Sequence, residues 1–183
     1  MYFKGIGIPK NYEKAYYWFT ESSKQGFSEA QYNLGIMFDH GNYVQKNRQK
    51  ALEFYRKAAD NNFAKAQFNL ANAYLEGNGL EKNYKKALEL YTKAAQEKLP
   101  EALYNLGTIY EKGEIVPKND TKAFELYMEA AKLNFAEAQN NVGYIYANTY
   151  GDLEKAKFWF GKAYENGYED AGNALNQLEL LSN

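Results

Sequence analysis

Few residues in this sequence could do chemistry. His40 is the only histidine and cysteine is absent, so thiolate metal ligands, cysteine nucleophiles and disulfides are excluded, and no second imidazole is available for a metal site. A Ser-His-Asp constellation would have to use His40, yet no serine has a nucleophile-elbow motif beside it. The serines are Ser22, Ser23, Ser28 and Ser182. We therefore expect no catalytic residue, no metal and no cofactor, and we interpret His40 as a solvated turn residue.

Two glycine triplets resemble phosphate-binding loops. They are "GIG" at Gly5–Gly7 and "GNG" at Gly77–Gly79. A phosphate loop follows a strand, whereas these triplets follow predicted helices and recur as turns, which favours a structural role. The many carboxylates alternate with lysines on predicted exposed helix faces, a pattern typical of a solvated, salt-bridged surface.

Composition narrows the classes of partner. The net charge is −1, from 22 basic and 23 acidic residues, which gives no electrostatic reason to expect binding to nucleic acid or to an anionic membrane. No apolar run approaches the roughly 18 residues of a membrane span, so we predict no membrane insertion. The opening "MYFKGIGIPK" lacks the apolar core of a signal peptide. The sequence does not indicate a cellular compartment.

The dominant feature is an internal repeat. Two series of alanines recur at 36-residue intervals: Ala30, Ala66, Ala102 and Ala138, and Ala15, Ala51, Ala87 and Ala123. The next members, Ala171 and Ala156, each follow after 33 residues, so the last unit has lost three residues between its two alanines. A fixed period of this size indicates stacked structural units that bury a shared core.

Each unit is predicted to hold two helices. In the first full unit, apolar residues at helical spacing place one helix over Glu29–His40 and a second over about Asn47–Asn61. Asn or Asp precedes every second helix as an N-cap. A glycine or asparagine follows each one as the left-handed residue, with Lys98 as the exception. A small residue, such as Gly35 in the first helix, allows a neighbouring helix to approach closely.

The repeated pattern resembles the Sel1-like repeat family, a relative of the tetratricopeptide repeats. The resemblance rests on A-x-x-x-L-G-x-x-Y, present as "ALYNLGTIY" at Ala102–Tyr110, on glycine loops such as "GNGLEKNYKKA" at Gly77–Ala87, and on the K-A-A ending. It implies a binding scaffold without enzymatic activity. A cysteine-rich bacterial subgroup has been associated with weak penicillin binding, which makes a cell-wall-ligand role a remote alternative.

We therefore predict an all-α, right-handed solenoid of about ten helices in antiparallel pairs, forming one domain over residues 1–183. The boundaries are a partial repeat at 1–28, full repeats at 29–64, 65–100, 101–136 and 137–169, and a capping helix at 170–183. Because Met1 falls at the end of a first helix that is otherwise missing, we expect the chain to be cut from a longer protein.

A partner would lie in the concave groove lined by the first helices. Reading the repeats in register gives three sets of equivalent positions. We call them the aromatic rung (Tyr32, Phe68 and Tyr104), the asparagine rung (Asn33, Asn69, Asn105 and Asn141) and the mixed rung, which includes Asn72 and Tyr144. The predicted groove residues are Tyr32, Asn33, Phe68, Asn69, Asn72, Tyr104, Asn105, Asn141 and Tyr144. Alternatively, the asparagines bond a neighbouring repeat and the aromatic rings pack against the adjacent first helix. We expect a protein or peptide partner that is neutral or mildly basic.

A second candidate surface lies on the first helix of the chain. Tyr16, Tyr17 and Trp18 follow one another there, although inner repeats carry glutamate at the place of Tyr17. Either an upstream helix covers them, or they form a partner or homodimer interface. Three functions thus remain open: a groove-binding adaptor, a spacer or assembly segment of a longer protein, and the remote cell-wall-ligand role.

Overall fold

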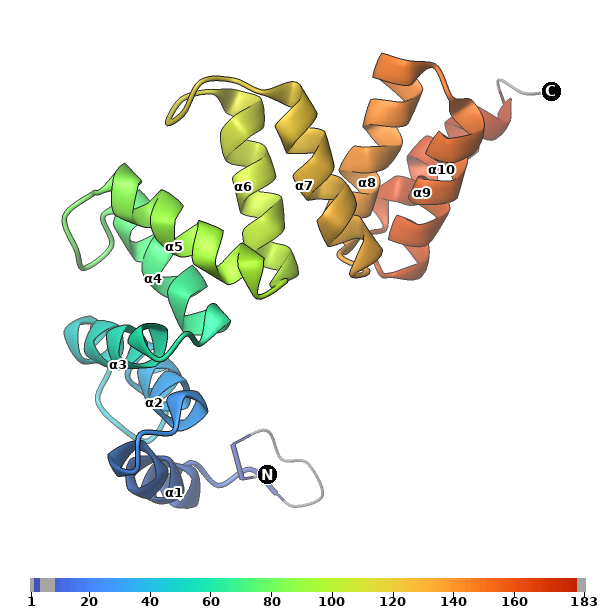
Figure 1. The fold of residues 1–183 in the computed structure, drawn as a ribbon. Helices are drawn as coiled ribbons and strands as arrows, with labels where there is room; N and C mark the ends of the chain where they lie inside the picture. Colours follow the sequence, from blue (N-terminus) through green and yellow to red (C-terminus); the bar gives the residue numbers. More distant parts are fainter. Residues whose placement is uncertain (1, 4–8, 181–183) are drawn as a thin grey trace. The chain divides into compact units, whose positions relative to one another are not determined.

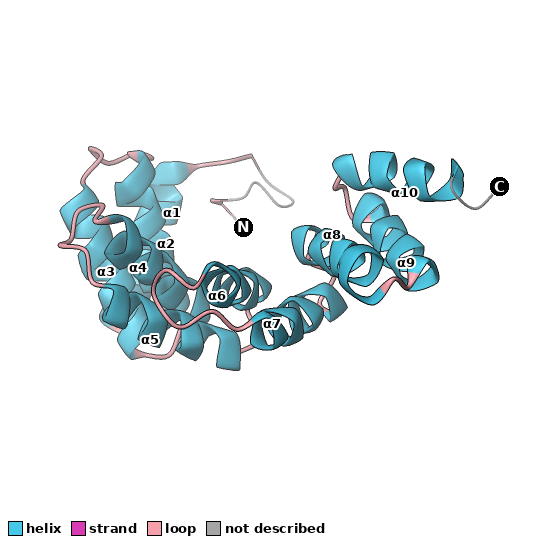
Figure 2. Cartoon of the chain, turned by 90° about the horizontal axis from the view of Figure 1, so that it is seen from above, coloured by secondary structure: helices cyan, strands magenta, loops and turns pink. Residues whose placement is uncertain are grey.

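The computed structural model describes residues 2–3 and 9–180, and within them the chain is helical, with no strand (Figure 2). It forms α1 (Tyr12–Lys24), α2 (Ser28–His40), α3 (Arg48–Asp60), α4 (Ala64–Glu76), α5 (Tyr84–Gln96), α6 (Pro100–Lys112), α7 (Asp120–Lys132), α8 (Ala136–Ile145), the π-helical segment η1 (Tyr146–Tyr150), α9 (Leu153–Glu165) and α10 (Asp170–Leu180). The prediction of an all-α helical repeat with about ten helices is confirmed.

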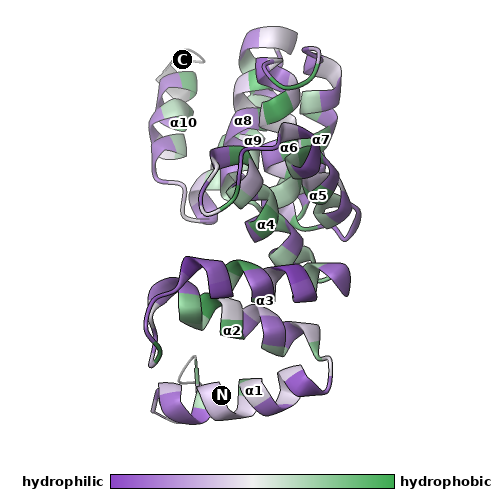
Figure 3. Cartoon of the chain, turned by 90° about the vertical axis from the view of Figure 1, so that its left-hand side faces the viewer, coloured by the Kyte–Doolittle hydropathy of each residue, from purple (hydrophilic) through white to green (hydrophobic). Residues whose placement is uncertain are grey.

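The helices fall into two compact units. Unit 1 spans Met1–Glu97 and unit 2 spans Lys98–Asn183. In unit 1, α1 packs on α2, α2 on α3, α3 on α4 and α4 on α5 (Figures 1 and 3). Unit 2 repeats this order, with α6 on α7, α7 on α8, α8 on α9 and α9 on α10. Among the described residues, no helix is both long and apolar enough to cross a membrane.

The helix ends follow the predicted capping pattern. Before each second helix an Asn or Asp side chain accepts a hydrogen bond from the backbone N–H three residues later, at 2.9–3.0 Å. These N-caps are Asn11, Asn47, Asn83, Asn119 and Asp152. Each of these helices is followed by a residue of positive φ, as predicted for Gly26, Asn62, Asn134 and Gly167. Lys98 adopts the same conformation, with φ 57°, so the backbone is set by the turn and not by the residue type.

The core of each pair is a tyrosine or phenylalanine packed against a small residue. Tyr55 is buried, and a Cβ added to Gly35 would lie 2.5 Å from its ring. In unit 2, Gly107 and Tyr127 repeat this contact, at 2.6 Å. The small residue of the first helix therefore allows the aromatic ring of the second helix to cross it, as the sequence predicted.

The last repeat closes differently from the others. In the preceding pairs the loops 41–47, 77–83 and 113–119 separate the two helices. In the last pair α8 continues as η1 to Tyr150, and only Gly151 and Asp152 precede α9. The loss of three residues is thus absorbed by a π-helical turn and a short link, a local adjustment that the alanine spacing did not predict.

Candidate partner-binding surfaces

In each of the first three full repeats, a buried tyrosine of the second helix bonds a polar residue of the first helix. The Tyr55 hydroxyl lies 3.3 Å from Asp39 Oδ2, and the Tyr127 hydroxyl donates to Glu111 Oε2 at 2.8 Å. Tyr91 donates to Asn72 Oδ1. Burial raises the pKa of Tyr55 and of Tyr127 above that of an ordinary tyrosine. The hydroxyls of all three tyrosines bond a polar residue of the first helix.

Each residue of the aromatic rung packs on the buried tyrosine of its own repeat. The Tyr32 ring lies 5.8 Å from Tyr55 and 5.1 Å from Phe63, centroid to centroid. Further contacts of the same kind are Phe68 with Tyr91 at 5.8 Å, Tyr104 with Tyr127 at 5.5 Å and Tyr104 with Phe135 at 5.4 Å. Tyr32, Phe68 and Tyr104 are half-buried. Packing therefore uses one part of each ring, and the remainder is accessible to a partner.

The asparagine rung also has partners within the chain. Asn33 Nδ2 donates to the Glu29 carbonyl at 2.9 Å. Burial raises the pKa of Tyr55 and of Tyr104, while the side chains of Asn69 and Asn141 lower the pKa of Tyr55 and Tyr104 respectively. Each of these amides therefore lies close to the hydroxyl of a tyrosine in the preceding repeat. Asn105 holds the same position and is half-buried.

The end of the mixed rung is the most accessible part. Tyr144 exposes 47% of its surface, while its ring packs edge to face with Phe160, at 4.9 Å between centroids. The other eight predicted groove residues are half-buried. The neighbouring Asn140, which occupies the aromatic position of this repeat, is buried, and its Oδ1 has no hydrogen-bond partner among the described residues.

Unit 2 brings predicted residues together around an open pocket. This α8 pocket has a volume of about 340 Å³ and is lined by Glu111, Asn141, Tyr144, Ile145, Asn148 and Thr149. Asn141 and Tyr144 were predicted groove residues, while Asn148 and Thr149 were not. They line the pocket because α8 continues into η1. The pocket joins amide, hydroxyl and carboxylate groups with one aromatic ring, which is a set suited to recognition.

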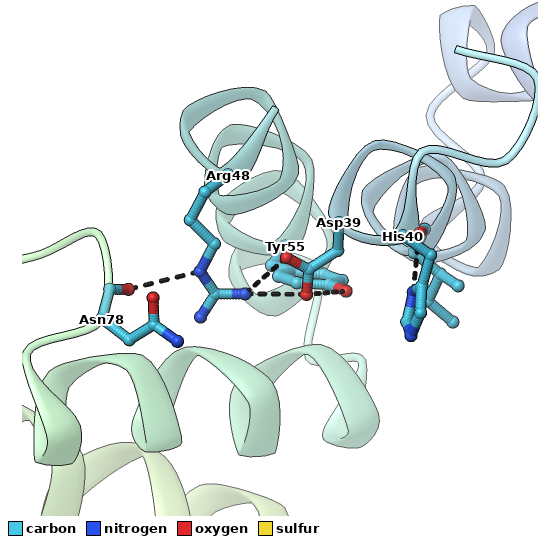
Figure 4. Close-up of polar contacts among 6 residues, drawn as sticks. Asp39, His40, Arg48, Tyr55 and Asn78 are labelled. Carbon is cyan, nitrogen blue, oxygen red and sulfur yellow. Dashed lines mark hydrogen bonds and ion pairs between the residues drawn. The ribbon is translucent and has the colours of Figure 1, made fainter. Parts of the chain in front are cut away.

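An ion pair marks the corresponding place in unit 1. Arg48 Nη1 donates to both carboxylate oxygens of Asp39, at 2.9 and 2.7 Å, and its Nε donates to the Asn78 carbonyl at 3.3 Å (Figure 4). Asp39 also meets the Tyr55 hydroxyl. His40 lies beside this cluster, with Nδ1 3.0 Å from the Ile36 carbonyl of its own helix. The side chain of His40 is exposed at the end of α2, close to the solvated position predicted.

The predicted end interface divides into a buried and an exposed part. Tyr16 packs against Phe38 and Tyr43, at 6.3 and 5.8 Å. Tyr17 and Trp18 expose 58% and 56% of their surfaces and contact each other edge to face. Beside them, the α1 pocket of about 430 Å³ is lined by Phe19, Ser22, Phe27, Ser28, Glu29 and Ala30.

The sequence analysis missed a column of buried glutamines. Gln139 Nε2 donates to the Ala131 carbonyl at 3.0 Å, and its Oε1 accepts from Asn166 at 2.9 Å. Gln67 bonds the Ala59 carbonyl in the same way, at 3.4 Å. Gln31, Gln67 and Gln139 share the period of the alanines, and that spacing was the available signal. The amides of Gln67 and Gln139 join the end of one second helix to the next first helix, while Gln31 accepts a bond from Asn61 in its own pair.

The arrangement offers no evident catalytic centre. Among the described residues, no group of three His, Cys, Asp or Glu side chains is placed to hold a metal ion. The sole imidazole contacts its own helix. What the described surfaces can do chemically is hydrogen-bond, pair charges and bury apolar groups.

Comparison with protein families identifies the repeat along the chain. The Sel1 repeat model matches residues 1–27, 28–63, 64–99, 100–135 and 136–168. The last four matched segments each begin one residue before the corresponding full repeat of our sequence analysis, and the first begins at the same residue as the predicted partial repeat. No curated protein matches the chain.

Solved structures give the same result. A Sel1 repeat protein from Oxalobacter formigenes is 32% identical, with a TM-score of 0.87 over 93% of this chain and 71% of that protein. A protective antigen of uropathogenic Escherichia coli with an SLR fold is 28% identical, with a TM-score of 0.82 over 98% of this chain, which spans only 39% of the antigen. Cysteine-rich protein B of Helicobacter pylori is 24% identical, with a TM-score of 0.56 over 70% of this chain and 92% of that protein, and shows the fold alone.

Proposed function

Because this chain belongs to the Sel1 repeat family, which is generally a protein–protein interaction module, we propose that it is a non-enzymatic adaptor that binds a peptide or protein partner on the exposed face of its first helices. The observation that carries this proposal is the α8 pocket. Tyr144, the most accessible of the predicted groove residues, and Asn141 both line this open pocket of about 340 Å³, which supports the proposal.

The chemistry of the α8 pocket suits an extended peptide. A side-chain amide has two donor hydrogens and an acceptor oxygen, so Asn141, which lines the pocket, can bond a peptide backbone even though it lies close to the Tyr104 hydroxyl. Asn148 and Thr149 add further polar groups. The exposed ring of Tyr144 supplies the kind of large, rigid anchor that dominates binding energy at interfaces.

Unit 1 presents its own version of this face. Tyr32, Asn33, Phe68, Asn69 and Asn72 are half-buried on α2 and α4. We propose that their accessible parts contact the same class of partner. Because the three aromatic residues of the rung also pack on the buried tyrosines, replacing them with alanine would disturb both binding and folding. A test of the face therefore starts from Tyr144.

The experiment uses peptides selected from a random display library on the full chain. Their dissociation constants are measured by fluorescence anisotropy for the wild type, Tyr144→Ala and Asn141→Ala. Tyr84→Ala is the matched control, because Tyr84 is similarly exposed, at 50%, but lies in unit 1. We expect Tyr144→Ala to weaken binding about ten-fold or more, with little change for Tyr84→Ala. Equal affinity across all variants, with unchanged circular dichroism, would contradict the proposal.

A second candidate function is assembly through the first helix. Tyr17 and Trp18 are more than half exposed and adjoin the α1 pocket, and exposed aromatic surface of this kind favours association. Size-exclusion chromatography with light scattering would report the mass of the wild type and of Tyr17→Ser/Trp18→Ser. A dimer that dissociates in the double variant would support assembly. A concentration-independent monomer would contradict self-assembly through this helix.

The absence of enzymatic activity is part of the proposal. It is supported by the family, because Sel1 repeat proteins are generally non-catalytic scaffolds. Hydrolysis of any β-lactam or peptide substrate that disappears on His40→Ala would overturn it.

A further inference from the structure

The same three positions carry a carboxylate, a tyrosine and a helix-start residue in two of the repeats, with different outcomes. In unit 1 these residues are Asp39, Tyr55 and Arg48. The carboxylate of Asp39 receives the Tyr55 hydroxyl and two bonds from the Arg48 guanidinium, at 2.9 and 2.7 Å (Figure 4). In unit 1, therefore, a carboxylate and a tyrosine hydroxyl that contact each other bind a guanidinium of the same chain.

In unit 2 the carboxylate and the tyrosine are kept but the guanidinium is not. Two repeat lengths later, Glu111 receives the Tyr127 hydroxyl at 2.8 Å. The place of Arg48 is taken by Asp120, which makes only a surface ion pair with Lys118, at 3.3 Å. Within the described part of the chain, no cationic group lies within ion-pairing distance of Glu111. Where unit 1 has a carboxylate paired with a guanidinium, unit 2 therefore has two carboxylates, of which only Asp120 has a cationic partner among the described residues, the exposed Lys118.

These carboxylates line a partly open pocket that has an aromatic wall. The Phe124 pocket, of about 340 Å³, is lined by Glu111, Asp120, Thr121, Ala123, Phe124, Ile145, Thr149 and Tyr150. The rings of Phe124 and Tyr150 lie 5.5 Å apart, centroid to centroid. The volume is at the lower end of the range for small-ligand pockets, about 300–1,000 Å³, and so suits a single side chain better than a folded element.

We propose that the Phe124 pocket takes an arginine side chain of the partner peptide, whose guanidinium occupies the position that Arg48 fills in unit 1. The guanidinium would form charge-assisted hydrogen bonds with Glu111 and face Asp120. Its aliphatic stem and planar head would lie against Phe124 and Tyr150, because arginine packs both its methylenes and its charged plane on aromatic rings.

The inference rests on the proposed function, and it adds a residue preference to it. Glu111 also lines the α8 pocket, together with Ile145 and Thr149. The two pockets therefore adjoin. A peptide whose backbone lies along the α8 pocket would bring one of its side chains to the Phe124 pocket. A lysine could reach the same carboxylates but lacks the paired donors that Arg48 uses on Asp39.

The test uses N-acetyl-arginine amide as a probe, with the lysine and norleucine analogues for comparison. Each is titrated into the isotopically labelled full chain and followed by nuclear magnetic resonance. We expect arginine to shift the amide signals of Glu111, Thr149 and Tyr150, lysine to act several-fold more weakly, and norleucine to have no effect. Shifts that are equal for arginine and norleucine, or that lie elsewhere, would overturn the inference.

Three variants assign the effect to the carboxylates. Glu111→Gln keeps an acceptor for Tyr127 but removes the charge, so it should weaken arginine binding about ten-fold. Asp120→Arg restores the arrangement of unit 1 and should close the pocket to the probe with an internal guanidinium. Glu125→Gln is the control. Glu125 is an exposed carboxylate on α7, the helix that begins at Asp120, and it is paired with Lys122. Equal binding by Glu111→Gln and Glu125→Gln would overturn the inference.

The selected peptides separate this inference from the function on which it rests. If they contain a common arginine, and Glu111→Gln weakens only the peptides that carry it, both are supported. If peptides bind and depend on Tyr144 but show no arginine preference, the proposed function stands and the arginine pocket is wrong. If no peptide binds while the arginine probe still depends on Glu111, the pocket stands and the proposed function is wrong.

Discussion

Gly107→Ala in α6 tests whether the contact between a small residue and a buried ring sets the spacing of the helix pairs. A Cβ at Gly107 would lie 2.6, 2.7 and 3.2 Å from three Tyr127 ring atoms, whereas carbon atoms in contact prefer about 3.5–4.0 Å. The ring cannot turn away freely, because it is fully buried and its hydroxyl is bound to Glu111. The ring or the helix must therefore move.

The expected cost follows from three contributions to the free energy of unfolding. Overpacking a core typically costs about 1–3 kcal/mol. Weakening the bond between Tyr127 and Glu111 adds about 1 kcal/mol. Replacing a mid-helix glycine with alanine returns about 1 kcal/mol. We therefore expect Gly107→Ala to lower the free energy of unfolding by about 1–3 kcal/mol. The cost stays finite because Ala71 already occupies the equivalent place opposite Tyr91.

A second glycine provides the matched control. Gly161 lies inside α9, and a Cβ there would meet no atom within 4 Å, so Gly161→Ala should raise stability by up to about 1 kcal/mol. Both changes fall in unit 2. Because each unit contains one tryptophan, Trp18 or Trp159, a Trp18→Phe background leaves Trp159 as a fluorescent reporter of unit 2. Urea unfolding followed by fluorescence and by circular dichroism gives the two free energies.

Gly107→Ala and Gly161→Ala should change the free energy of unfolding in opposite directions. If Gly107→Ala stabilises the chain as much as Gly161→Ala does, the ring contact does not limit the approach of the two helices. If both variants destabilise it, the helix-propensity contribution is wrong. Opposite signs, with an unchanged dependence on urea concentration, would support the account.

Three further predictions concern turns, caps and alkaline pH. Lys98→Gly should raise the free energy of unfolding by about 1 kcal/mol, because Lys98 holds φ 57° at a conformational cost that glycine does not carry. A thermal unfolding midpoint that is unchanged or lower would contradict this. Asn119→Ala removes the bond to the Lys122 N–H at 2.9 Å and should cost about 0.5–2 kcal/mol in urea unfolding, whereas no loss would mean that water replaces the cap. Burial raises the pKa of Tyr55 and Tyr127 in the folded chain. Their contribution to stability is therefore complete below the pKa of about 10 that tyrosine has in the unfolded chain, and it is lost as the pH rises toward the folded pKa. The free energy of unfolding falls by at most about 1.4 kcal/mol per pH unit for each tyrosine. Tyr127→Phe should flatten that decline, and an identical pH profile in the variant would contradict the assignment.

Much of the fold could be predicted from the sequence because it depends on short-range chemistry. An N-cap such as Asn47 bonds the N–H of Lys50, only three residues away, and a left-handed residue such as Gly26 closes the preceding helix. These signals recur with the alanine period. The helix ends and the number of helices therefore follow from residues that lie near one another in the chain.

The candidate surfaces were predicted less completely. The sequence identified Asn141 and Tyr144 by their register, and the structure places both on one pocket. It did not indicate that Asn148 and Thr149 would join them, because their position depends on the π-helical continuation of α8. Nor did register distinguish Tyr16, which packs into the core, from Trp18 beside it, which is largely exposed.

The sequence by itself determined the family, the repeat length, the helix order and the small residues that let helices approach. The tertiary structure alone decided which polar groups meet. Asp39 is paired with Arg48, while Glu111, at the same position of a later repeat, lines the Phe124 pocket and bonds the Tyr127 hydroxyl. The physical reason is that capping and periodicity act between near neighbours, whereas a charge pair or a pocket depends on where side chains from different helices end after the backbone has packed.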